Sequence, residues 1–65
     1  MKTFYDIQQL LKRFGIFIYT GHRLADLELM ESEIRELHRL HLIEPSEYTL
    51  AMVVIRQEMN KEMKK

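Results

Sequence analysis

Basic and aromatic side chains occur together in the first 23 residues of the sequence. This stretch holds four Lys or Arg residues against one Asp, and five of the six aromatic residues lie before residue 20. Cations can follow the phosphates of a single-stranded nucleic acid, and any base can stack on an aromatic ring. The stretch therefore favours single-stranded RNA or DNA as a ligand. The zero formal net charge of the chain argues against a binder of duplex DNA, which usually carries a strongly basic patch.

Not every aromatic residue of this stretch is free to meet a ligand. Phe4 and Phe14 fall on the apolar stripe of a predicted helix, which leaves Tyr5, Phe17 and Tyr19 as candidates for stacking on bases. Because aromatic side chains are usually core residues, we expect burial over ligand contact by roughly two to one at each of these three positions.

The histidines raise the question of a metal site. His38 and His41 are three residues apart, and Glu31 or Glu44 could lie near them. A transition-metal site normally needs three or four converging ligands, and the spacing places only two here. We therefore expect no metal site, with His41 ending a helix and His38 in solvent.

Catalytic chemistry has less support. Ser32 and Ser46 have no base placed to activate them, and the chain has no Cys. Gly15 and Gly21 lack the Lys-Thr or Lys-Ser that follows a phosphate-binding loop. The dense acidic side chains of residues 24–47 are typical of a solvated helix face. We expect a protein that is not an enzyme and needs no cofactor.

The elements that must position these side chains follow from the spacing of apolar residues. Repeats of three and four residues predict helices over about 4–14, 22–40 and 45–62. The fold class is therefore all-α, a compact three-helix bundle that forms one domain over residues 1–65.

Residue types at the helix boundaries support this division. Thr3 can cap the first helix, and Gly15 can end it because glycine adopts the left-handed conformation without steric cost. Thr20 is the predicted N-cap of the second helix, and Pro45 suits the first turn of the third.

The stretch GIFIYTG between the first two helices is predicted to be an ordered connection. Periodicity leaves open whether it is a short strand, an extended linker or a helical turn. If it is extended, Ile16 and Ile18 pack inward while Phe17 and Tyr19 face a different side.

A second function stays open because several apolar residues lie outside the predicted core. Their number exceeds what one face of a small bundle needs, and a cluster of such residues usually marks an interface. The alternative to nucleic-acid binding is a small protein-interaction or regulatory adaptor without a nucleic-acid ligand. It would form a homo-oligomer through Leu29, Leu40, Leu50, Val53 and Val54.

Neither a membrane nor a secreted location is predicted. No uninterrupted apolar run approaches the length of a membrane span. The absence of Cys fits a reducing compartment. We expect a cytoplasmic protein.

Three stretches, TFYDIQQLLKRFGIFIYTG, LMESEIREL and LIEP, resemble the YqgQ-like family of small bacterial cytosolic proteins. The similarity covers nearly the whole chain except the Lys-rich tail, and residues 3–21 carry its most specific part. The resemblance implies an all-α three-helix fold, a proposed ability to bind single-stranded nucleic acid, and no catalytic residues. This sequence has His22 and His41 where the family often has an acidic residue and a glycine.

Carried over to matching positions, the resemblance implies a nucleic-acid site around the connection. Gly21 allows close approach of the backbone, and Arg23 supplies charge beside the free N–H groups of a helix start. An architectural interpretation has equal weight, with Thr20 as a helix cap, Gly21 as a turn residue and Arg23 solvated. The candidate nucleic-acid-binding residues are Lys12, Arg13, Tyr19, Thr20, Gly21 and Arg23.

Overall fold

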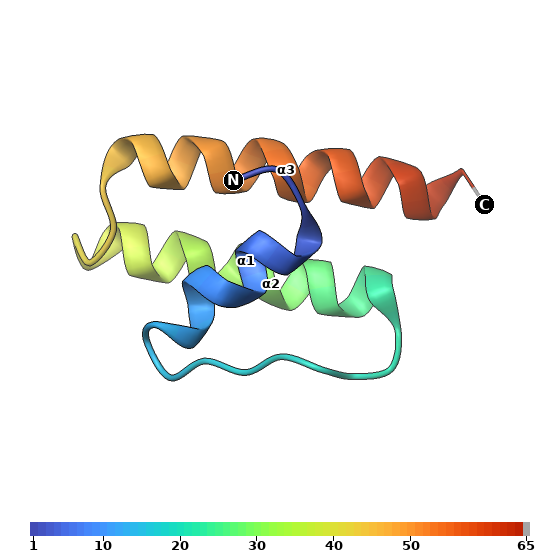
Figure 1. Ribbon diagram of the computed structural model, residues 1–65, viewed down its shortest axis with the longest axis horizontal. Helices are drawn as coiled ribbons and strands as arrows, with labels where there is room; N and C mark the ends of the chain where they lie inside the picture. Colours follow the sequence, from blue (N-terminus) through green and yellow to red (C-terminus); the bar gives the residue numbers. More distant parts are fainter. Residues whose placement is uncertain (65) are drawn as a thin grey trace.

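Three helices and no strand make up residues 1–64, the part of the chain that the computed structural model describes. Helix α1 spans Phe4–Lys12, α2 spans Arg23–Arg39 and α3 spans Pro45–Met63. The two long helices, α2 and α3, run antiparallel side by side, and α1 packs against both (Figure 1). The predicted all-α three-helix bundle is confirmed. Lys65, the last residue of the predicted domain, lies outside the described residues.

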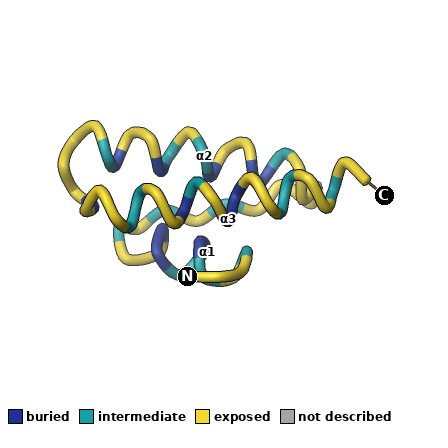
Figure 2. The backbone as a smooth tube through the Cα atoms, turned by 90° about the horizontal axis from the view of Figure 1, so that it is seen from above, coloured by how far each residue is buried: buried dark blue, intermediate teal, exposed yellow. Residues whose placement is uncertain are grey.

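The core lies where the three helices face one another. Figure 2 shows the buried positions on the sides of the helices that point inward. In α1 these positions are Ile7, Leu10 and Leu11, which repeat at the predicted spacing of three and four residues. The other buried apolar residues are Leu27, Met30, Ile34, Leu37, Ile43, Ala51, Val54 and Ile55. Within residues 1–64, no helix is both long and apolar enough to cross a membrane.

Val54 requires a correction, because it was predicted to lie on an exposed interface. Its side chain is only 4% exposed and belongs to the core. Apolar residues surround much of α3, and the face that packs inward carries Ala51, Val54 and Ile55 at spacings of three and four residues. The remaining predicted interface residues are about half exposed: Leu29, Leu40, Leu50 and Val53. Self-association through these four residues stays a prediction.

Helix α1 begins with the predicted cap. The Thr3 hydroxyl oxygen accepts a hydrogen bond from the Asp6 N–H at 3.2 Å, and the Asp6 carboxylate accepts one from the Thr3 N–H at 3.0 Å. The same carboxylate accepts a further bond from the Lys2 N–H at 2.7 Å. The Glu58 carboxylate of α3 accepts the N–H of Phe4 at 3.2 Å, so α1 is capped from within its own turn and from α3.

Gly15 ends the first helical segment as predicted. Its φ of 74° lies in the left-handed region, and its N–H donates to the Lys12 carbonyl at 3.0 Å. The Ile16 N–H then donates to the Leu11 carbonyl at 3.1 Å, which satisfies another free carbonyl of the last turn. The regular helix α1 itself ends at Lys12, two residues before its predicted end.

His41 ends α2 by the same arrangement, although it is not a glycine. Its φ is 60°, and its N–H donates to the His38 carbonyl at 3.0 Å. The Leu42 N–H donates to the Leu37 carbonyl at 2.9 Å. The prediction that His41 terminates this helix is confirmed. His41 carries a β-carbon and nevertheless adopts a backbone conformation that favours glycine.

The connection between α1 and α2 is extended and runs alongside α2 (Figure 1). Ile16 and Ile18 are partly buried and pack against the core, whereas Phe17 and Tyr19 are exposed. This alternation is the predicted one, because successive side chains of an extended backbone point to opposite sides. The two isoleucines therefore hold the connection in place and leave the two rings outside.

Replacing His41 with glycine is expected to stabilise the fold. The left-handed conformation costs a non-glycine residue about 1–2 kcal/mol, and the greater freedom of glycine in the unfolded chain offsets part of the gain. We expect His41→Gly to raise the free energy of unfolding by about 0.5–1 kcal/mol in urea denaturation. His41→Ala is the matched control, since it removes the imidazole but keeps a β-carbon. An equal gain in the alanine variant would show that the imidazole, not the backbone, causes the effect.

Acid is expected to weaken the cap of α1. Hydrogen bonds from the backbone N–H groups of Lys2 and then Thr3 hold the pKa of the Asp6 carboxyl below its ordinary value of 3.8. Because this pKa is lower in the folded state, the stability that the ionised Asp6 carboxylate contributes is fully present above pH 3.8. It is lost as the pH falls through the pKa of the folded state. The urea midpoint of Asp6→Asn should therefore fall less on acidification from neutral pH than that of the parent. Parallel losses in the two proteins would rule out a role for the Asp6 charge.

Candidate functional site

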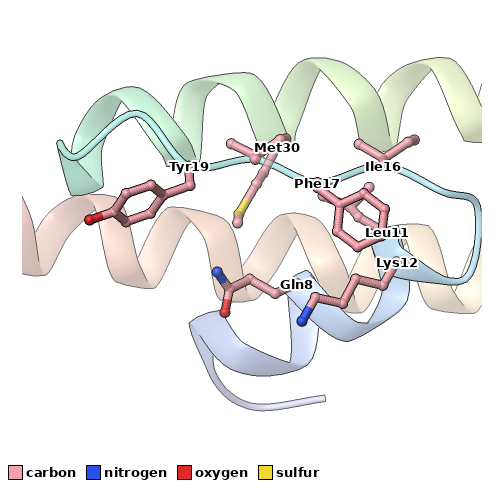
Figure 3. A pocket seen from close by; sticks show the side chains of 8 residues that line it. Gln8, Leu11, Lys12, Ile16, Phe17, Tyr19 and Met30 are labelled. Atoms are coloured by element: carbon pink, nitrogen blue, oxygen red, sulfur yellow. The ribbon is translucent and has the colours of Figure 1, made fainter.

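One face of the molecule is formed by α1 and the connection that follows it. Tyr5, Gln8 and Lys12 are separated by three and four residues, so they share one stripe of α1. Phe17 and Tyr19 of the connection lie beside this stripe, and they line a hollow together with Gln8 and Lys12 (Figure 3). Helix and connection thus present their polar and aromatic side chains to the same space.

Two adjoining hollows mark this face. The first has a volume of about 310 Å³ and is lined by Gln8, Leu11, Lys12, Ile16, Phe17, Ile18, Tyr19 and Met30. The second has a volume of about 420 Å³ and is lined by Thr3, Phe4, Tyr5, Gln8, Tyr19, Arg23, Asp26 and Glu58. Gln8 and Tyr19 belong to both hollows. The two hollows therefore form a continuous surface from Lys12 to Arg23.

Three aromatic rings on this face are exposed to solvent. Tyr5 is 62% exposed, Phe17 is 74% exposed and Tyr19 is 87% exposed. The expectation that burial is favoured at each of these positions is therefore wrong. The core is already filled on this side by α1 residues and by Ile16 and Ile18, so the alternating rings are left outside.

Two of the three candidate cations lie along the same surface. Lys12 lines the first hollow, and Arg23 lines the second with its guanidinium carbon 3.9 Å from the centre of the Phe4 ring. This contact holds the Arg23 guanidinium against α1 by a cation–π interaction. We use the name basic aromatic face for the surface of Tyr5, Lys12, Phe17, Tyr19 and Arg23.

Arg13, the third candidate cation, is engaged elsewhere. Its Nη1 lies 3.2 Å from Oε2 of Glu47 in α3, and its guanidinium carbon lies 5.7 Å from the centre of the Phe14 ring. It lines neither hollow of the basic aromatic face. The structure therefore brings Lys12, Tyr19 and Arg23 together and leaves Arg13 at the contact between α1 and α3.

Thr20 and Gly21 have architectural positions. The Thr20 N–H and hydroxyl each donate to Oδ1 of Asp26 at 2.7 Å. Thr20 is not the N-cap of α2, which is His22, because the Thr20 hydroxyl is bonded to the Asp26 side chain and to the His22 N–H. Gly21 has a φ of 91° and makes the turn into α2, with nothing within 4 Å of the place where a β-carbon would lie.

Two residues important to this face were not predicted from the sequence. Asp26 is only 4% exposed and holds the end of the connection through Thr20. Gln8 stands between the two hollows. An acidic residue six positions after a threonine at a helix start was the available signal for Asp26. For Gln8 the signal was its spacing from Tyr5 and Lys12 on one stripe of the helix.

His38 and His41 have different surroundings in the structure. Across residues 1–64, no three His, Cys, Asp or Glu side chains form a group that could hold a metal ion. The His38 ring stacks on the Tyr48 ring of α3, with 4.0 Å between centroids and 13° between planes. His38 is thus partly buried in the contact between α2 and α3, and the expectation that it lies in solvent is wrong. His41 belongs to the turn described above.

The fold and this surface define a small all-α protein whose first helix and connection carry exposed rings beside cations. The model of the YqgQ-like family matches residues 1–61, and the chain belongs to this family. It is similar to the uncharacterized protein YqgQ of Bacillus subtilis (strain 168), with 46% identity over 59 residues, or 91% of this chain and 83% of the relative. The resemblance inferred from the sequence is confirmed.

Removing the Thr20 hydroxyl is expected to destabilise the fold. Thr20→Val keeps the shape of the side chain but takes one hydrogen bond from the buried Asp26 carboxylate. The Asp26 carboxylate keeps the bond from the Thr20 N–H. Because a hydrogen bond to a charged group contributes about 1.5–3 kcal/mol, we expect a loss of about 1–3 kcal/mol by urea denaturation. Thr49→Val is the matched control, because the Thr49 hydroxyl donates to the Pro45 carbonyl at an exposed site on α3. Equal losses in both variants would show that the Thr20–Asp26 bond has no special role.

Proposed function

We propose that this protein binds single-stranded RNA or DNA on the basic aromatic face, and that it is a binding protein, not an enzyme. The observation that carries the proposal is the exposure of Tyr5, Phe17 and Tyr19, between 62% and 87%, on the surface that also presents Lys12 and Arg23. Large apolar rings in solvent gain free energy when a ligand covers them. Planar bases suit such rings because every base offers a face for stacking.

The arrangement supports binding through both parts of a nucleotide. Base–aromatic stacking contributes about 1–3 kcal/mol per base, largely without regard to sequence. Lys12 and Arg23 lie at opposite ends of the continuous surface, where they can meet phosphates on either side of a stacked base. The cation–π contact with Phe4 uses none of the hydrogen-bond donors of Arg23, so its N–H groups can donate to phosphate oxygens.

The face has a fixed shape before any ligand binds. Ile16 and Ile18 anchor the connection to the core, and two hydrogen bonds to Asp26 hold its end at Thr20. A preformed surface loses less conformational entropy on binding than a mobile loop. Because RNA and single-stranded DNA are found in the bacterial cytoplasm, the proposal places the protein there.

Fluorescence anisotropy with a labelled single-stranded oligonucleotide of mixed sequence tests the proposal. Lys12→Ala and Arg23→Ala should each weaken binding and reduce the slope of log affinity against log salt by about 0.7, the effect of one lost phosphate contact on a single strand. Tyr19→Ala should weaken binding about tenfold through lost stacking. The melting temperature of this variant should match that of the parent, because the ring is 87% exposed.

Arg13→Ala is the matched control for the two cation variants. It removes the same charge from the first part of the chain, but Arg13 pairs with Glu47 away from the basic aromatic face. Exposed ion pairs contribute little to stability, so this variant should fold and bind like the parent. No detectable binding at low salt with micromolar protein would overturn the proposed function. Equal weakening by Arg13→Ala and Arg23→Ala would overturn the proposed site.

A further inference from the structure

A third hollow lies on the two long helices, outside the basic aromatic face. Its volume is about 510 Å³, and it shares no lining residue with the two hollows of that face. We call it the α2–α3 hollow. Arg35 of α2 lines it together with seven residues of α3, which are Tyr48, Thr49, Met52, Val53, Arg56, Gln57 and Asn60. The proposed binding of nucleic acid leaves this part of the surface unused.

The α2–α3 hollow opens on the side of α3 that faces away from α1. Helix α1 lies on one side of the α2–α3 pair (Figure 2), where the Phe4 N–H donates to Glu58 of α3. Arg56 precedes Glu58 by two residues, a rotation of about 200° around a helix, so it points to the opposite side. Residues 1–64 contain no fourth helix that could cover this side as α1 covers the other.

Two guanidinium groups share one carboxylate at this hollow. Nη2 of Arg35 lies 3.6 Å from Oε1 of Glu31, and Nε of Arg56 lies 3.8 Å from Oε2 of the same residue. Both distances exceed the range of about 2.7–3.2 Å for a hydrogen bond, and neither guanidinium donates one to any group of residues 1–64. One positive charge is therefore in excess, and the lining includes no Asp or Glu. A carboxylate is the group that complements this arrangement.

The centre of the hollow suits aliphatic side chains better than bases. Met52 and the half-exposed Val53 lie between the polar residues of the lining, and methionine adapts its shape to different partners. The only aromatic ring of the lining belongs to Tyr48, which is partly buried and stacked on His38. The exposed rings that favour nucleic acid on the basic aromatic face are thus missing from the α2–α3 hollow.

We propose that the α2–α3 hollow binds an acidic amphipathic helix of a partner protein. Such a helix carries apolar side chains along one stripe, which would meet Met52 and Val53, and carboxylates beside the stripe, which would pair with Arg35 and Arg56. Recognition of an amphipathic helix by an apolar groove is a recurrent mode of binding. The bound helix would cover the second side of the α2–α3 pair.

The charges argue against a second copy of this chain as the occupant. A two-fold axis through the hollow would bring Arg35 and Arg56 of one copy close to the same residues of the other. Like charges that face each other across an interface oppose binding. The inference is independent of the proposed binding of nucleic acid, because it uses other residues.

Fluorescence anisotropy with two labelled synthetic peptides tests the charge requirement. Both peptides have about 20 residues, long enough for a helix in water, and carry Leu at spacings of three and four residues. The first has Glu beside the Leu stripe and the second has Gln at the same positions. The parent should bind the Glu peptide at micromolar protein and the Gln peptide at least tenfold more weakly, since two charged pairs are lost.

Two pairs of variants test the position of the peptide. Arg56→Gln should weaken binding of the Glu peptide about fivefold, and Arg39→Gln is its control because Arg39 pairs with Glu36 and lines no described hollow. Val53→Ser should weaken binding by a similar factor through lost apolar contact. Leu50→Ser is its control, since Leu50 is equally exposed on α3 but lies outside the hollow.

Weaker binding in Arg56→Gln and Val53→Ser, with binding retained in both controls, supports the inference. Equal affinity for the two peptides, or no binding of the Glu peptide, overturns it. Weaker peptide binding in Lys12→Ala than in Arg56→Gln would place the peptide on the basic aromatic face and also overturn it. So would a dimer of the parent alone in light scattering that Val53→Ser abolishes, or an oligonucleotide affinity that Arg56→Gln reduces more than Arg23→Ala does. Melting temperatures show whether each variant is folded.

Discussion

A buried carboxylate fixes the path of the chain between α1 and α2. Asp26 is 4% exposed, and one of its oxygens accepts both the N–H and the hydroxyl of Thr20. A carboxylate removed from water must keep its hydrogen-bond donors, so Thr20 has little freedom to move. Fixing Thr20 fixes the extended segment before it. Ile18 then faces the core while Phe17 and Tyr19 face the solvent.

The fold was largely predictable because each helix carries its own local signals. Thr3 and Asp6 form a reciprocal cap, and Gly15 ends the first segment in the left-handed conformation, as residue type alone indicates. Val54 was misplaced because apolar residues occur on most sides of α3, so spacing does not single out the buried face. Thr20 was misplaced as a cap because its partner is a side chain in the next helix.

The candidate site was predictable only in part. Residue type together with the resemblance to the family indicated Lys12, Tyr19 and Arg23, but nothing local separates Lys12 from its neighbour Arg13. That separation depends on Glu47, 34 residues away, which the fold places beside the Arg13 guanidinium. The exposure of the rings also depends on what else fills the core. General preference favours burial of aromatic residues, and the tertiary structure overrides it here.

The hydrogen bond from Phe4 to Glu58 joins residues 54 positions apart, and this separation has a consequence for the order of folding. Helix α1 has nine residues, and isolated helices shorter than about 12–15 residues are marginal in water. Contacts between distant residues form late because the intervening chain must first be closed into a loop. A chain emerging from the ribosome therefore makes α1 first, but this helix and the basic aromatic face that it carries gain their support from α3 only after residue 58 has been synthesised.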